Sequence, residues 1–258
     1  MLFVKLFSFI LARAAAPTAI GFSAMSSIDS TILIDARNVT KGYGWLPVLR
    51  GLTLSVPRGQ SLALMGANGS GKSTLLRLLT GLSRPDSGTL NIAGWTMPQE
   101  AAQVRSHLGV VAHRPLVYEG LTARENLRFY GRLYGLNGAG LEGRIVAELD
   151  RVGLKRRADD VTRTFSRGML QRLSIARALL HEPDILLLDE PFTGLDPAAI
   201  ALLSQLIADS RSAGQTIVMT THDAIHAITL SDRVIVIAKG GIAFDAPTAG
   251  LAAENIPV

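Results

Sequence analysis

The most constraining feature of this sequence is the stretch GANGSGKST at residues 66–74. It fits the pattern G-x-x-x-x-G-K-[ST], whose fixed positions are occupied by Gly66, Gly71, Lys72 and Ser73. A glycine-rich turn that needs positive φ would also explain the glycines. The order of the residue types instead indicates a loop that wraps around phosphate groups, and such a loop requires a strand before it and a helix after it.

The sequence on either side supplies both elements. The run SLALM at 61–65 is short and wholly apolar, which is typical of a buried parallel strand. The segment 72–82 places leucines at helical spacing and has Gly81 near its end, so it predicts a helix. The motif therefore lies in the strand–loop–helix setting that phosphate binding requires.

The rest of the chain predicts further strands and helices. Antiparallel strands are expected at 31–56, in a strand pair after the turn-rich segment 83–94, and in a hairpin at 232–247. Helices are expected over 122–136, 141–154 and 166–180. In the last of these, one apolar stripe contains Met169, Leu173, Ala176 and Leu180, and Arg172 lies outside it.

Two more apolar runs predict buried strands, at 184–190 and 216–223. Strands that alternate with helices favour an α/β fold with a central parallel sheet. Ligands of such sheets bind beyond the carboxyl ends of the strands. The three runs end in GANGSGKST, DEP and THD, so we expect these polar groups to line one crevice.

The residue types in that crevice suit a nucleoside triphosphate and magnesium. Backbone N–H groups and a helix N-terminus attract phosphate, and Lys72 is placed to reach the β- and γ-phosphates. The Ser73 hydroxyl is expected to ligate Mg²⁺, and Asp189 to orient the magnesium shell through water. Taken alone, Asp189 and Glu190 also fit a polar pair at the end of a strand.

Two residues are candidates for the catalytic step. The Glu190 side chain is expected to point in another direction from that of Asp189. Glu190 is therefore a candidate general base that holds the attacking water. His222 ends a neighbouring strand, where its imidazole could hydrogen-bond the γ-phosphate and position the water. A lone histidine is otherwise more often structural.

Composition limits the other possibilities. The chain has no cysteine, which excludes disulfides and thiolate metal sites. Its net charge of +5 could indicate nucleic acid or an anionic membrane surface. However, there is no dense Lys/Arg run, since the nearest one, at 151–160, is interrupted by acidic residues. No direct nucleic-acid partner is therefore expected.

The N-terminal residues 1–28 form an apolar extension unlike the rest of the chain. Three interpretations compete: a signal or transit-type segment, a membrane-surface helix, or an extension ahead of a true start at Met25. The last is favoured. We expect one ATP-binding domain at 29–248 and a C-terminal tail at 249–258.

Five motifs, spread over about residues 31–247, resemble the nucleotide-binding domain of ATP-binding-cassette (ABC) transporters. The stretch FSRGMLQRLSIARALL is similar to the family's LSGGQ signature, with Ser166 and Gly168 in register. DEPFTGLD resembles the acidic Walker B end and the D-loop, and TTHD resembles the switch-histidine strand. KGYG puts Tyr43 where the family stacks an aromatic ring on adenine.

The resemblance implies an ABC ATPase fold: a P-loop NTPase core with a RecA-like parallel sheet, an antiparallel β subdomain, and an α-helical subdomain at about 114–180. It implies ATP and Mg²⁺ as cofactors. It also implies a homodimer with ATP at the interface, which drives separate transmembrane subunits from the cytoplasmic face of the inner membrane. The nucleotide-contacting residues that it implies are Tyr43, Gly66, Ala67, Asn68, Gly69, Ser70, Gly71, Lys72, Ser73, Thr74, Ser166 and Gly168.

The sequence also departs from the family. His113 stands where the family usually has glutamine, and is not counted as a ligand. The signature has Phe165, Arg167 and Met169 in place of leucine, glycine and glutamine. The motifs look most like the haem-exporter ATPase of cytochrome c maturation. The alternatives are a drug or polysaccharide exporter, a non-transport ABC ATPase, and a regulatory module that binds nucleotide without hydrolysing it.

Overall fold

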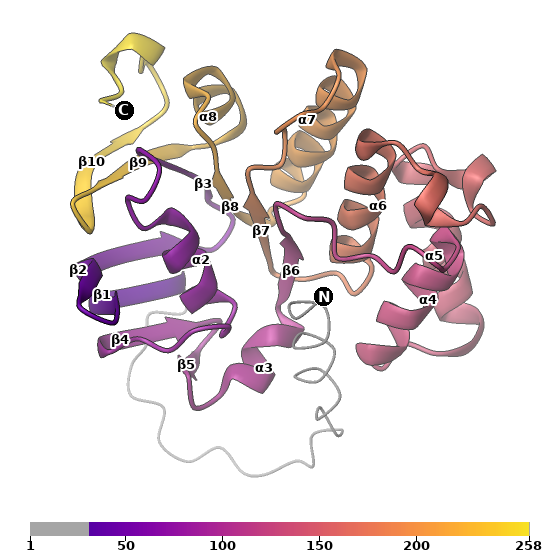
Figure 1. The fold of residues 1–258 in the computed structure, drawn as a ribbon, viewed down its shortest axis with the longest axis horizontal. Coiled ribbons are helices and arrows are strands. Elements are labelled where there is room, and N and C mark those ends of the chain that lie inside the picture. The colour runs from indigo at the N-terminus through magenta and orange to yellow at the C-terminus, as the bar shows by residue number, and fades with distance from the viewer. Residues whose placement is uncertain (1–30, 258) are drawn as a thin grey trace.

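The computed structural model describes residues 31–257, which form two β-sheets with helices packed against them (Figure 1). The predicted N-terminal extension lies outside these residues. The smaller sheet has the strand order β2-β1-β4-β5 and is antiparallel throughout. Its strands are β1 (Ile32–Tyr43), β2 (Leu46–Pro57), β4 (Ser87–Ile92) and β5 (Trp95–Met97).

The larger sheet has the strand order β10-β9-β3-β8-β7-β6 and is parallel except for its edge strand β10. The inner strands β3 and β8 are buried along their whole length, as the apolar runs predicted. The strands are β3 (Ser61–Met65), β6 (Leu108–Val111), β7 (Ile185–Asp189), β8 (Thr216–Thr220), β9 (Arg233–Ala238) and β10 (Gly241–Pro247).

Both faces of the larger sheet are covered, and successive residues of β7 show it. Leu187 packs in a cluster with helix α2 (Lys72–Leu79) and the antiparallel sheet. Leu186 and Leu188 point the other way, into a cluster with α7 (Pro197–Ser212) and the helical region. The α2 leucines fill the space between the two sheets, so the helix that follows the phosphate-loop motif is anchored in the main core.

Helix α2 is shorter than the predicted 72–82. It ends at Leu79, because Gly81 adopts a left-handed φ of +70°. The Thr80 hydroxyl donates to the Leu76 carbonyl at 3.0 Å and satisfies one of the last acceptors of the helix.

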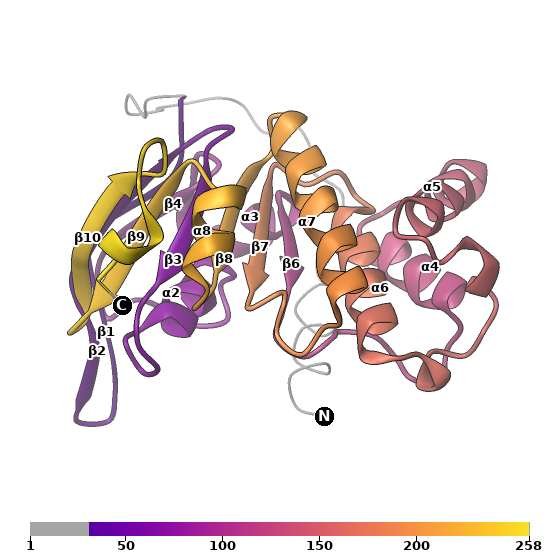
Figure 2. The ribbon, with the colours of Figure 1, turned by 90° about the horizontal axis from the view of Figure 1, so that it is seen from above.

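The helical region lies on the far side of the molecule from the antiparallel sheet (Figure 2). It contains α4 (Ala123–Leu133), α5 (Gly138–Arg151) and α6 (Arg167–Leu179). Helix α4 begins with a capping box, in which Glu125 N donates to Thr122 Oγ1 and Thr122 N donates to the Glu125 carboxylate.

The amphipathic prediction for α6 is only partly right, because this helix is buried on nearly every side. Leu173, Ala176 and Leu180 are in the core as predicted, but Arg177 on another side is also only 3% exposed. Its guanidinium donates to the Val110 carbonyl and lies over the Tyr130 ring, 4.9 Å from the centroid. Burial lowers the pKa of Arg177. These contacts fix α6 between β6 and α4.

The remaining helices are short or peripheral. They are α3 (Ala101–Ser106), α8 (Ala224–Leu230) and three 3-10 turns, at Lys155–Arg157, Thr162–Thr164 and Ala253–Asn255. Near the C-terminus, Ile256 is buried against α8, β3 and β9. No helix within residues 31–257 has the length and apolar character needed to cross a membrane.

The contact between β6 and α6 is close enough to test. A Cβ added to Gly109 of β6 would lie 2.5 Å from the Ala178 carbonyl oxygen and 2.8 Å from Pro183 Cγ. Gly109→Ala is therefore expected to lower the free energy of unfolding by about 1–3 kcal/mol, measured by urea denaturation. The control Gly143→Ala, in α5 with nothing within 4 Å, should be neutral or stabilising. Equal stability of the two variants would contradict the packing described.

Candidate active site

The three strand ends named by the sequence lie side by side. β3 pairs with β8, and β8 pairs with β7, all parallel, so their carboxyl ends share one edge of the sheet. Lys72 follows the loop after β3, Asp189 is the last residue of β7, and His222 lies two residues beyond the end of β8. The predicted convergence of these segments is confirmed.

The phosphate loop needs its glycines for close backbone approach. Gly66 has a φ of +135°, and a Cβ there would collide with the Ile237 carbonyl oxygen. Gly71 has a φ of +116°, and its Cβ would lie 2.8 Å from Leu49 Cδ2. Other side chains would strain this backbone and displace β9 or β2. The Ser70 hydroxyl is buried and has no hydrogen-bond partner among the described residues, so the loop has polar capacity left over.

The ammonium of Lys72 is an unusual charge, because it is buried and held by backbone carbonyls. The residue is 8% exposed, and its Nζ donates to the Gly66 carbonyl at 2.5 Å and the Ala67 carbonyl at 3.1 Å. Within residues 31–257 no carboxylate forms an ion pair with it. A buried cation without an anionic partner is costly, so this loop is suited to an anionic ligand.

Helix α2 offers the same ligand a second attraction. Its N-cap is Gly71, no side chain caps it, and no acidic residue lies in its first turn. The first-turn N–H groups therefore point outward without intrahelical acceptors. Together with the helix dipole they form an anion site beside Lys72. Ala67, Asn68 and Gly69 are exposed at the turn of the loop, and Ser73 and Thr74 begin the helix.

One hydroxyl organises the acidic end of β7. Thr220 lies directly opposite Asp189 in the β7–β8 pairing and is fully buried. Its Oγ1 donates to Asp189 Oδ1 at 2.8 Å and accepts from Glu190 N at 2.9 Å. Glu190 has a left-handed φ of +48°, which turns its side chain away from that of Asp189. This Thr220 bridge was not predicted, and a hydroxyl in TTHD beside the acidic pair was its only sequence signal.

Glu190 and His222 contact each other. His222 Nδ1 lies 2.8 Å from Glu190 Oε2. A carboxylate only accepts, so this hydrogen bond places a proton on Nδ1 and leaves Nε2 for another partner. The imidazole is 72% exposed and the Glu190 side chain 23%. The two predicted catalytic residues are thus already coupled at the edge of the crevice.

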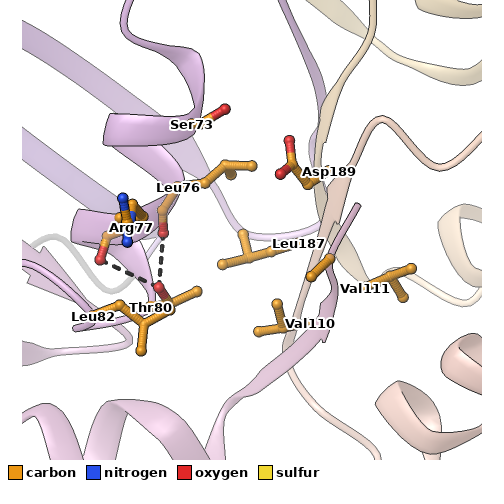
Figure 3. A pocket seen from close by; sticks show the side chains of 10 residues that line it. Ser73, Leu76, Arg77, Thr80, Leu82, Val110, Val111, Leu187 and Asp189 are labelled. Carbon is orange, nitrogen blue, oxygen red and sulfur yellow. Dashed lines mark hydrogen bonds between the residues drawn. The ribbon is translucent and has the colours of Figure 1, made fainter. Parts of the chain in front are cut away.

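Ser73 and Asp189 face the same cavity, which measures about 220 Å³ (Figure 3). Its other walls come from α2, β6 and β7 and are mostly apolar. Among the described residues there is no cluster of three or more His, Asp or Glu side chains that could hold a metal. Mg²⁺ is commonly bound by one or two protein oxygens together with phosphate oxygens and water, so Ser73 and Asp189 fit it with a nucleotide present.

Ser166 and Gly168 are not part of this crevice. Both lie at the start of α6, which in both views is separated from α2 by β6 and β7 (Figures 1 and 2). Ser166 Oγ accepts from Met169 N at 3.3 Å as the N-cap. A Cβ on Gly168 would lie 3.2 Å from Ala199 Cβ, so α6 and α7 begin in contact.

Two residues that depart from the family pattern can now be placed. Arg167 packs against Gly194: a Cβ on Gly194 would lie 2.6 Å from Arg167 Nη1. The Arg167 side chain, which stands where the family has glycine, therefore links the start of α6 to the segment after Glu190. His113 is exposed just beyond β6, next to Ala112 of the cavity wall. Tyr43 ends β1 and is 45% exposed.

Comparison with known proteins agrees with this geometry. Residues 49–193 match the sequence pattern of the family described as "ABC transporter". The match covers more than half of the chain and runs from β2 to the D-loop. This chain belongs to the ABC transporter family.

Two curated members of the ABC family are similar to it. The Nod factor export ATP-binding protein I of Ralstonia nicotianae is 40% identical over 83% of this chain and 66% of its own length. The linearmycin resistance ATP-binding protein LnrL of Bacillus subtilis is 36% identical over 81% of this chain and 67% of its own. The chain thus spans about two thirds of the length of these relatives.

A solved ABC structure shares the fold. The dimeric post-hydrolysis state of the ATP-binding cassette MJ0796, bound to ADP and Pi, has a TM-score of 0.77 and 28% identity. The similarity covers 84% of this chain and all of that one. The predicted ABC ATPase fold is confirmed, and the chain is an ABC-type ATPase by family and fold.

The Thr220 bridge gives the first test of the site. Thr220→Val keeps the shape of the side chain but leaves Glu190 N–H unpaired and Asp189 without its donor. We expect ATP turnover to fall about 10- to 100-fold, as for residues that orient metal ligands. The free energy of unfolding should fall by about 1–3 kcal/mol. Thr220→Ser, which keeps the hydroxyl, should stay near the parent in both assays. Parent-like turnover in the valine variant would show that the bridge does not position the acids.

Proposed function

We propose that this chain is the ATP-hydrolysing subunit of an ABC exporter. In this proposal ATP binding and hydrolysis drive separate membrane subunits from the cytoplasmic face of the cell membrane. The observation that carries the proposal is the buried Lys72 ammonium, held by loop carbonyls and without a carboxylate, at the edge where Asp189, Glu190 and His222 gather. A polyanionic ligand would supply the counter-charge that this arrangement lacks.

Each residue of the site has its own role in ATP hydrolysis. Lys72 and the first-turn amides of α2 hold the phosphates, and they offset the charge that develops during phosphoryl transfer. Ser73 and Asp189 are the residues that would hold magnesium, which would supply further neutralisation of the phosphate oxygens. Glu190 accepts the proton of the attacking water. His222, hydrogen-bonded to Glu190 through Nδ1, keeps that carboxylate in place and leaves Nε2 free to bind the γ-phosphate.

A second copy of the chain completes the site. Ser166 and Gly168 open α6, whose N-terminus is another anion site, but they lie away from Lys72 of the same chain. A homodimer brings the start of one α6 to the phosphates held by the other copy. Such an arrangement makes ATP the link between protomers, and hydrolysis the step that releases them.

The cargo is proposed from the relatives. Their names mention Nod factor export and linearmycin resistance, and neither mentions haem. Haem export and a role in cytochrome c biogenesis are therefore not supported, and the resemblance that suggested them did not reach that level of detail. We propose export of a drug-like or polysaccharide-type molecule instead. A non-transport role is disfavoured, since the matching family is that of transporters.

Removing the Lys72 cation tests the loop. Lys72→Ala should weaken ATP binding by about a hundredfold, because two charge-assisted hydrogen bonds to phosphate are lost. Isothermal titration calorimetry with ATP measures this directly. Lys155→Ala removes an equal charge from an exposed site paired with Asp150, so it should bind ATP like the parent. Unchanged affinity in the Lys72 variant would rule out the loop as the phosphate site.

Replacing Glu190 separates binding from chemistry. Glu190→Gln should bind ATP normally, lose turnover by about 10²- to 10⁴-fold, and accumulate as an ATP-bound dimer. Phosphate release and size-exclusion chromatography with light scattering measure the two effects. Glu182→Gln is the control, since Glu182 is an exposed carboxylate that also has a positive φ, of +54°. If Glu190→Gln hydrolyses ATP at the parent rate, another group is the base.

A further inference from the structure

The tip of the β1–β2 hairpin carries an exposed aromatic surface. Trp45 is fully exposed, Leu46 is 66% exposed and Tyr43 is 45% exposed. Within residues 31–257 only two other large apolar side chains, Val146 and Ile225, are comparably exposed, and each lies on a different helix. A tryptophan that nothing covers, next to a half-exposed tyrosine, marks a binding surface.

The hairpin is fixed to the phosphate loop. Gly71 of the loop approaches β2 so closely that a Cβ on it would lie 2.8 Å from Leu49 Cδ2 and 3.5 Å from Val48 Cγ1. From Val48 the chain runs back three residues to Trp45, in the turn before β2, a span of at most about 10 Å. Figure 2 shows the hairpin projecting past the loop that joins β3 to α2. A nucleotide whose phosphates occupy the loop has its base separated from them by the ribose, and the hairpin tip is the surface at that reach.

The two rings are not equivalent. Lys41 Nζ lies 5.6 Å from the centroid of the Tyr43 ring, so an ammonium already covers one face of that ring. The Trp45 ring, two residues further on and beyond Gly44 with its φ of +58°, has both faces open to solvent. A base that stacks on the other face of Tyr43 still has its own second face exposed, and Trp45 is the next aromatic residue along the hairpin.

We propose that Trp45 forms a second wall of the base site, so that the base of the bound nucleotide lies between the Tyr43 and Trp45 rings. This inference rests on the proposed function and extends it by naming a residue that sets base affinity. Stacking does not read hydrogen-bonding edges but grows with ring area, so the site prefers purine to pyrimidine nucleoside triphosphates. The contact is made within one chain and does not need the dimer.

The test compares nucleotides with a ligand that has no base. Calorimetry in EDTA, which prevents hydrolysis, measures the Kd of ATP and of inorganic tripolyphosphate. Trp45→Ala is expected to weaken ATP about tenfold and leave tripolyphosphate unchanged, while Trp45→Phe stays within about twofold of the parent. Val146→Ala, which removes an exposed apolar side chain on α5, is the control and should bind ATP like the parent. The preference for ATP over CTP should shrink in Trp45→Ala.

A spectroscopic readout is independent of affinity. The sequence holds two tryptophans, Trp45 and Trp95, so Trp95→Phe leaves Trp45 as the sole indole. ATP should quench its emission, and tripolyphosphate should not. The inference is overturned if Trp45→Ala binds ATP like the parent, or if Trp45 emission ignores ATP and responds instead to self-association or to anionic lipid vesicles. Loss of ATP binding in Lys72→Ala with parent affinity in Trp45→Ala would leave the proposed function standing and remove only this inference.

Discussion

The candidate site depends on one positive charge that is held inside a glycine-rich loop. Lys72 is buried, and its ammonium is satisfied by two carbonyl groups of its own loop rather than by an acid. That loop keeps its shape because Gly66 and Gly71 adopt φ values that other residues resist, and because β9 and β2 press against the two glycines. The loop is therefore rigid before any ligand arrives, and binding need not pay for ordering it.

Much of this fold could be predicted from sequence because its inner strands are short and wholly apolar. Runs such as SLALM can only be buried on both faces, and this forces helices onto both sides of a parallel sheet. The burial of α6 could not be predicted in the same way. A helical period identifies one apolar face, whereas the burial of Arg177 depends on β6 and α4 arriving from other parts of the chain.

The candidate site, too, could be predicted only in part from the sequence. Lys72, Asp189, Glu190 and His222 could be named because each lies at the polar end of an apolar run, where parallel strands place ligands. The Thr220 bridge and the Glu190–His222 hydrogen bond could not, since both depend on the register between β7 and β8, which sets Asp189 opposite Thr220. A shift of one residue would send the Thr220 hydroxyl to the other face of the sheet.

The signature segment at the start of α6 contacts the segment that follows Glu190 in the same chain. Glu190 is followed four residues later by Gly194, on which Arg167 at the first turn of α6 rests. Asp196 caps α7 by accepting from Ala199 N, and Ala199 in turn packs against Gly168. The start of α6 therefore contacts the segment that follows Glu190, the proposed general base, although Ser166 and Gly168 themselves lie away from Lys72. Because these are close packing contacts, a change in the backbone at Glu190 is expected to move the start of α6, which is the surface proposed to face a second protomer.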